Sequence, residues 1–217
     1  MSERTQRRLE AATGLAFVVL MSVALVLPGQ PPKAQDSIET ISALLLDRRW
    51  AFLVGSYVAG LAVMAYLWFL AGVRDYLRAR GADRLGGAAC AGGVFAITVM
   101  LVGMAMFSGV AFVAARLGDP PLVRALTDTG NMAIEMSKFG FAVFVLAVSS
   151  SGRERGGLPR WLVQLGIASV PVMLVSAIAL FVDHGVFQFG GLVDLGGAVP
   201  ALVWIGGLSV VMLRSAR

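Results

Sequence analysis

The chain has 217 residues, of which 58% are hydrophobic and only 14% are charged, against roughly 25% charged residues in an average soluble domain. A soluble fold of this size needs more polar side chains to cover its surface, so this composition indicates an integral membrane protein. The formal net charge is +5. No basic stripe with interleaved aromatic residues accompanies that charge, and we expect no nucleic-acid partner.

Six apolar segments reach or approach the roughly 20 residues that a membrane-spanning helix needs. They are residues 11–28, 51–73, 86–115, 132–150, 161–182 and 192–213. Their continuous apolar runs lack the alternation typical of barrel strands. The sequence therefore predicts an all-α, polytopic helix bundle that forms one membrane domain over residues 1–217. A cleaved signal peptide is the alternative for the first segment, although no small-x-small cleavage motif follows it.

The basic residues indicate an orientation for this bundle, because short cytoplasmic connections are enriched in arginine and lysine. They concentrate on the side of the membrane that holds the N-terminus: Arg4 to Arg8, Arg74 to Arg84, Arg153 to Arg160, Arg214 and Arg217. We therefore expect a multi-pass protein of the cell membrane, with the lipid bilayer as its partner and both termini in the cytoplasm.

The first outer connection, residues 29–50, predicts a short amphipathic helix that lies on the outer membrane face or over the bundle. Asp36 and Glu39 have the spacing of a capping box. Apolar residues then follow at helical spacing: Ile38, Ile41 and Leu45. Trp50 stands where an aromatic residue would anchor the second span at the membrane interface.

Small residues in the third segment predict where helices approach each other closely. Gly87 and Ala91, and likewise Ala88 and Gly92, have the small-x-x-x-small spacing that lets two backbones meet. We therefore expect much of the third and sixth segments to be buried in the bundle. The only cysteine, Cys90, lies in the same run, where it is expected to pack rather than to react.

The fourth segment carries the clearest ionisable residues within a span. Asn131, Glu135 and Lys138 share one helix face. One interpretation is that Glu135 and Lys138 pair where the helix meets water, with the Lys138 ammonium reaching the surface. The other is that Glu135 faces a cavity of the bundle as an acid, a base or a cation contact.

Further polar residues are expected at the same end of the bundle. We consider four residues as candidate acid–base groups: Glu135, Asp194, Asp183 and His184. The candidate ligand-binding residues are Asn131, Lys138, Gln188 and Asp128. No His-x-x-x-His, Glu-x-x-His or cysteine pair is present, so the sequence predicts no metal site and implies no cofactor.

Several stretches resemble uncharacterised membrane proteins of actinobacteria, grouped in families of domains of unknown function. The matching stretches are Asp47 to Arg49, Tyr66 to Arg74 and Leu158 to Leu162. This resemblance implies a six-helix bundle and carries over no activity or catalytic residue. In size and layout the chain is also distantly similar to small integral-membrane terpene cyclases, with which it shares no motif.

Three functions remain as hypotheses from the sequence. The first is a membrane protein that binds a small or lipid-like apolar molecule in an outer-side cavity. The second is a membrane enzyme that uses acid–base groups on an isoprenoid or lipid-like substrate. The third is a small transporter. Whether the chain acts alone or as a homo-oligomer is left open. The first two hypotheses predict that Glu135 and Asp194 point into one shared cavity.

Overall fold

The computed structural model describes residues 2–29, 32–33, 35–114, 117–182, 184–189 and 191–216, with the backbone alone at 114, 192, 194–196 and 198. These residues form helices and connecting turns, with no strand among them. The α-helices are α1 (Glu3–Val26), α2 (Ile38–Asp47), α3 (Arg49–Arg78), α4 (Asp83–Gly109), α6 (Pro120–Arg155), α7 (Arg160–Ser176) and α8 (Leu192–Ser215). A π-helix, η1 (Val110–Ala114), extends α4, and a 3₁₀ helix, η2 (Ala177–Leu180), extends α7.

Each of the six predicted apolar segments coincides with a helix. Five helical stretches are long and apolar enough to cross a membrane, namely α1, α3, α4 with η1, α6, and α7 with η2. The sixth, α8, contains a shorter apolar stretch, Val199–Ser215. The all-α prediction is therefore confirmed for the described residues.

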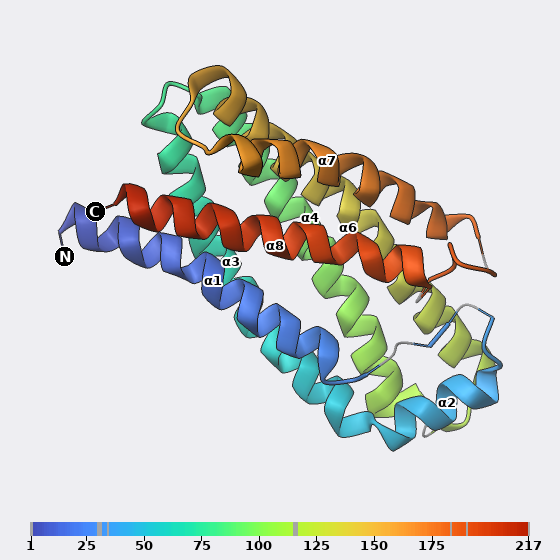
Figure 1. The fold of residues 1–217 in the computed structure, drawn as a ribbon. Coiled ribbons are helices and arrows are strands. Elements are labelled where there is room, and N and C mark those ends of the chain that lie inside the picture. Colours follow the sequence, from blue (N-terminus) through green and yellow to red (C-terminus); the bar gives the residue numbers. More distant parts are fainter. Residues whose placement is uncertain are drawn as a thin grey trace.

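The six long helices form a closed ring. Each packs against the next along the chain, in the order α1, α3, α4, α6, α7, α8, and α8 packs against α1. Figure 1 shows that successive helices run in opposite directions, so both chain ends lie at the same end of the bundle. We call this end the terminal end, and we call the opposite end, which carries α2, the α2 end.

Aromatic side chains fill the centre of the ring. The ring of Tyr66 on α3 lies 4.6 Å from that of Phe17 on α1 and 5.8 Å from that of Phe144 on α6. Phe144 in turn meets Trp204 of α8 edge-on at 5.6 Å. All four side chains are buried. Tilted and edge-to-face pairs add to the packing energy of such large side chains, so this cluster joins four helices.

Backbone contacts between glycines hold α4 against α6, which is the most extensive helix pair. A Cβ atom placed on Gly92 would lie 2.8 Å from the carbonyl oxygen of Gly140, and one on Gly103 would lie 2.7 Å from that of Gly130. The predicted close approach is thus confirmed at Gly92. It is wrong at Gly87, where a Cβ would meet nothing within 4 Å.

Burial is greatest in α6 rather than in α4, contrary to the prediction for the third segment. In the most apolar 18-residue stretch of each helix, 56% of the residues of α6 are buried against 33% in α4. Residue size explains the difference, because the small residues of α4 admit α6 along one narrow face and leave its large side chains, such as Phe95, on the surface.

Helix α6 also begins earlier than predicted, at Pro120 instead of near Met132. The Asp119 side chain caps it by accepting a hydrogen bond from the backbone N–H of Leu122, at 3.1 Å. Pro120 occupies the first helical position, where a missing N–H costs nothing. The helix has 36 residues, or about 54 Å at 1.5 Å per residue, so its first turns extend the polar face beyond the apolar part of the ring.

The predicted short helix is present as α2, but its cap differs. Ser37, not Asp36, accepts the hydrogen bond from the backbone N–H of Thr40. Asp36 instead accepts a bond from the backbone N–H of Lys33, at 2.8 Å. The apolar face of α2 buries Ile41 and Leu45 against a second, smaller core. Helix α2 therefore covers one end of the bundle, in contact with α3 and α6.

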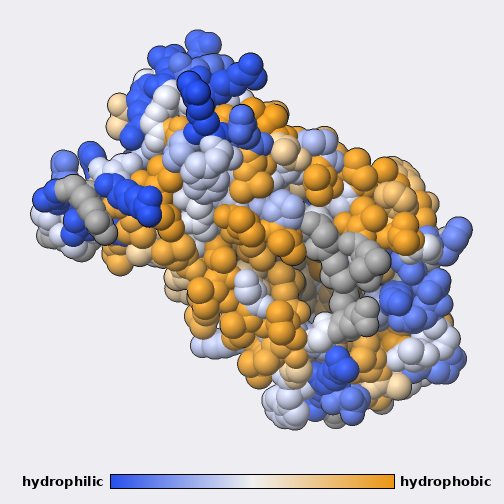
Figure 2. All heavy atoms as spheres, viewed as in Figure 1, coloured by the Kyte–Doolittle hydropathy of each residue, from blue (hydrophilic) through white to orange (hydrophobic). Residues whose placement is uncertain are grey.

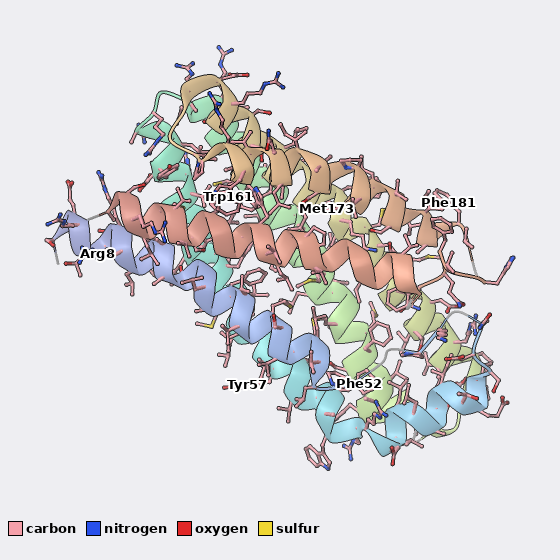
Figure 3. All side chains as sticks on the ribbon, in the orientation of Figure 1. Arg8, Phe52, Tyr57, Trp161, Met173 and Phe181 are labelled. Atoms are coloured by element: carbon pink, nitrogen blue, oxygen red, sulfur yellow. The ribbon has the colours of Figure 1, made fainter. Side chains whose placement is uncertain are left out.

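Apolar side chains dominate the surface between the two ends. Figure 2 shows an orange band flanked by blue, hydrophilic regions at the terminal end and at the α2 end. Two large aromatic residues, Trp50 and Trp161, are 71% and 54% exposed. Figure 3 places Trp161 toward the terminal end and Phe181 toward the opposite one. This distribution of polarity matches a bundle whose middle contacts lipid.

Candidate functional site

A pocket with a volume of about 310 Å³ opens at the α2 end. One wall is the polar face of α6, and the other is apolar and comes from η2 and the chain that follows it. The described lining residues are Arg124, Asp128, Asn131, Met132, Glu135, Ala179, Leu180, Phe181, Val182 and Phe189. Its volume lies at the lower end of the roughly 300–1,000 Å³ usual for small-molecule sites.

The polar wall follows directly from helical spacing. Arg124, Asp128, Asn131 and Glu135 succeed each other by four, three and four residues, which places them in one row along α6. Asp128 accepts a hydrogen bond from Arg124 Nε at 2.8 Å, and both side chains are partly exposed. The outer part of the wall therefore carries an ion pair.

Arg124 also connects the pocket to the chain that leads into α2. Its Nη1 donates a hydrogen bond to the carbonyl oxygen of Asp36, at 3.2 Å. A planar guanidinium can hold a carboxylate and a carbonyl at the same time because its donors point in fixed, separate directions. Arg124 thus fixes the mouth of the pocket to the loop before α2.

Glu135 and Lys138 form a second ion pair deeper in the bundle. Lys138 Nζ lies 2.8 Å from Glu135 Oε1 and 2.7 Å from Oε2, and the two side chains are 10% and 2% exposed. The predicted pairing is confirmed. The accompanying interpretation, in which the Lys138 ammonium reaches surface water, is wrong, because α7 and α8 enclose it: a Cβ on Gly197 would lie 2.8 Å from Ser176 Cβ and 3.9 Å from Lys138 Nζ.

Asn131 lies between these two pairs and differs from both. It is only 7% exposed, and its Oδ1 has no hydrogen-bond partner among the described residues. A buried polar group without a partner costs about 1–3 kcal/mol. Among the described residues of the pocket wall, Asn131 therefore carries a buried acceptor whose hydrogen-bonding capacity is unused.

The apolar wall rests on a small core of its own. The ring of Phe189 stacks on that of Phe107 of α4 at a centroid distance of 6.4 Å. Both belong to the cluster that includes Ile41 and Leu45 of α2. Phe181 is 87% exposed beside the mouth of the pocket, and Figure 3 shows it at the end of the α7 segment. The site thus presents polar groups on one side and apolar groups on the other.

The pocket brings together some of the predicted site residues and not others. Asp128, Asn131 and Glu135 line it, while Lys138 lies behind Glu135. Gln188 is buried next to the lining residue Phe189, with its Oε1 unpartnered among the described residues.

For His184, Asp183 and Asp194 the described structure shows no place in the pocket lining. His184 is exposed and is not among the described lining residues. Asp183 lies outside the described residues, and Asp194 belongs to α8 but only its backbone is described. The predicted shared cavity is therefore observed for Glu135 and stays a prediction for Asp194.

Sequence reasoning missed Arg124 and the apolar wall at this site. Arg124 lies before the predicted fourth segment, residues 132–150, although its spacing of four from Asp128 indicates that the two can share one helix face. The apolar residues give no signal, because they resemble every other residue of a span.

A buried acid at the terminal end was missed as well. Glu10 is 5% exposed, accepts a hydrogen bond from Gln6 Nε2 at 3.0 Å, and packs against Gly72 of α3. It lines a smaller pocket of about 100 Å³ together with Asp75 and Arg80. Glu10 follows three basic residues in the N-terminal segment, so its sequence context predicts an exposed side chain.

Among the residues that the structure describes, no group of three or more His, Cys, Asp or Glu side chains is placed to hold a metal ion. Comparison with other proteins adds no assignment: no protein-family model, curated protein or solved structure matches the chain. The fold and the pocket therefore define only a class, a helical bundle with an apolar girdle and an amphipathic pocket at one end.

Proposed function

We propose that the chain is a six-span membrane protein that binds a small amphipathic molecule in the pocket at the α2 end, on the outer face of the membrane. The observation that carries the proposal is the pocket itself, in which the polar row of α6 faces an apolar wall formed by η2, Phe181 and Phe189. A molecule with a polar head and an apolar body is complementary to such a pair of walls.

Membrane insertion is supported by the exposed apolar side chains between the two ends. In water such large contiguous apolar patches are uncommon and promote association. Representative exposed residues come from four helices: Val19, Phe95, Val143 and Ile167. Helices α1, α3, α4 and α6 each have at least 24 residues, and α7 with η2 has 21, which suffices for the roughly 20 that cross a bilayer.

The orientation is supported by arginines at the terminal end, which include Arg78 in the last turn of α3 and Arg153 and Arg155 in the last turn of α6. Single-cysteine labelling in intact cells tests it, with Cys90→Ala as the background. Gln35→Cys, before α2, should react with a membrane-impermeant maleimide, and Ser215→Cys, at the end of α8, should react only after permeabilisation. Both native side chains are exposed. The reverse pattern would refute the orientation.

Ligand binding is tested by filling the pocket. Ala179→Trp places an indole against the polar wall, whereas Ala105→Trp adds the same group on the exposed surface of α4. Native mass spectrometry of protein purified in mild detergent should detect a small amphiphile with the wild type and with Ala105→Trp, and should find it depleted with Ala179→Trp. Equal retention by all three proteins would reject the pocket as the binding site.

The second candidate function is acid–base catalysis on an isoprenoid or lipid-like molecule, because Glu135 lines the pocket. Binding is the better supported function. Both Glu135 oxygens accept hydrogen bonds from the Lys138 ammonium, which is the arrangement of an ion pair rather than of a proton donor. If the copurified molecule is recovered unchanged after incubation with the protein, binding is favoured. Conversion that is lost in Glu135→Gln would favour the enzyme.

A further inference from the structure

We propose that the pocket selects an uncharged amphiphile whose head carries a hydroxyl group, and that Asn131 is the residue that recognises this group. The proposal rests on the proposed binding function and specifies the class of ligand. It follows from three properties of the pocket: how its charges are paired, which polar group is left without a partner, and how much space is available.

The charged groups of the described wall compensate each other. Arg124 is paired with Asp128, and Glu135 is paired with Lys138, both at contact distances below 3 Å. A charged ligand head placed between these pairs would lose its hydration without gaining a dedicated counter-ion. An uncharged head avoids that cost, so these two ion pairs of the described wall disfavour carboxylates, phosphates and ammonium groups beside them.

Asn131 supplies the recognition that the ion pairs do not. A side-chain amide offers one carbonyl acceptor and two N–H donors, and a hydroxyl group offers one donor together with acceptor lone pairs. A ligand hydroxyl can therefore satisfy either end of the amide, whichever way the amide is turned. Asn131 is 7% exposed, and its Oδ1, which has almost no exposed surface, lacks a hydrogen-bond partner among the described residues. A ligand hydroxyl would meet this oxygen once the amide turns toward the pocket, and would then relieve the cost of an unpaired buried group.

The available space sets the size of the ligand. A volume of about 310 Å³ holds about ten water-sized atoms, at roughly 30 Å³ each. The apolar wall from Ala179 to Val182 offers a contact surface for a hydrocarbon body. An eight-carbon alcohol, with nine non-hydrogen atoms, is therefore a matched probe of both walls.

The test compares four probes with the same chain: octane, 1-octanol, octanoate and octylammonium. Their binding to the purified full-length protein is measured at pH 7 by native mass spectrometry, at equal free concentrations. We expect 1-octanol to bind most tightly to the wild type. Asn131→Leu should weaken 1-octanol about tenfold, the value of one buried hydrogen bond, and should leave octane unchanged. Thr129→Leu, an exposed position on the same helix, should change neither.

A second variant keeps the test decisive if Asn131→Leu folds poorly. Asn131→Asp preserves the shape of the side chain and adds a negative charge, so it should shift the preference from 1-octanol toward octylammonium. Tightest binding of octanoate or octylammonium to the wild type would overturn the uncharged-head inference. Unchanged 1-octanol affinity in Asn131→Leu would overturn the role of Asn131. In both cases binding itself stands. If none of the four probes binds the wild type, the proposed function fails and this inference fails with it.

Discussion

Gly92 and Gly87 lie in the same helix and differ in what surrounds them, so they form a matched pair for testing how the bundle is held together. A Cβ on Gly92 would lie 2.8 Å from the carbonyl oxygen of Gly140 and 2.9 Å from Val143 Cβ, whereas one on Gly87 would have no neighbour within 4 Å. The backbone oxygen cannot turn aside as a flexible side chain can. Gly92→Ala must therefore push α4 away from α6.

The expected energies follow from two terms. Replacing glycine by alanine inside a helix favours the helix by about 1 kcal/mol, and this term is common to both variants. Overpacking a tight contact costs about 1–3 kcal/mol, and this term applies only to Gly92→Ala. We expect Gly87→Ala to be neutral or stabilising, and Gly92→Ala to be less stable than Gly87→Ala by about 1–3 kcal/mol.

Unfolding in mixed micelles with increasing sodium dodecyl sulfate, followed by far-ultraviolet circular dichroism, measures this difference. Gly140→Ala provides an internal check, since its Cβ would lie 2.7 Å from the Gly92 carbonyl oxygen. Because both variants stress one contact, the double variant should be less destabilised than the sum of the single ones. If Gly92→Ala and Gly87→Ala unfold at the same detergent fraction, the glycine contact does not hold α4 on α6 and the reasoning is refuted.

Three further predictions concern polar groups. Lys138→Met should lower the free energy of unfolding by about 3–5 kcal/mol in the same assay, because the buried Glu135 loses the cation that contacts both its oxygens. The double variant with Glu135→Gln should regain most of this stability. If it regains none, the two residues do not act as an ion pair. Tyr66→Phe should stabilise the fold by about 1 kcal/mol, because the buried hydroxyl has no partner among the described residues; a loss of stability would instead reveal a hidden hydrogen bond. The backbone N–H of Glu39 and the Ser37 hydroxyl hold the pKa of the exposed Glu39 carboxyl below its usual value. The ionised carboxylate therefore stabilises α2 at any pH above that usual pKa, and this stabilisation is lost as the pH falls through the lowered pKa. The protection of the α2 amides against hydrogen exchange, taken relative to the intrinsic rate at each pH, should fall over that acidic range in the wild type and show no such step in Glu39→Gln.

The sequence predicted the position of every long helix because a run of apolar residues is a strong local signal. It misplaced the start of α6 because Arg124 and Asp128 suggested a connection. The competing signal, Asp119 followed by Pro120 and Pro121, is typical of a helix N-terminus, and hydropathy does not contain it. Boundaries within a polar stretch depend on capping, which an average of hydropathy does not detect.

The contacts between helices were harder to predict than the helices. Gly87 and Gly92 both satisfy the small-x-x-x-small pattern, and only the partner helix determines which of them it meets. For the pocket, the polar wall was predictable from the spacing of Asp128, Asn131 and Glu135 along one face. The opposite wall could not be predicted, because it depends on how η2, at the end of α7, packs beside α6, and its residues are ordinary apolar ones.

The closed ring has a consequence for how the chain could be connected. Because α8 packs on α1, and Arg4 Nε donates a hydrogen bond to the carbonyl oxygen of Ala216 at 3.2 Å, the first and last helices are neighbours like any other pair. A short peptide joining residues 2 and 216 would preserve every helix interface, and the chain could then be opened elsewhere, for instance at Gly156 and Gly157 in the turn before α7. Such circular permutants would keep the same pocket. In the natural order α1 and α8 are the packed helices farthest apart in sequence, and in the permutant they become consecutive helices. The order in which the helices of the ring assemble should change as a result.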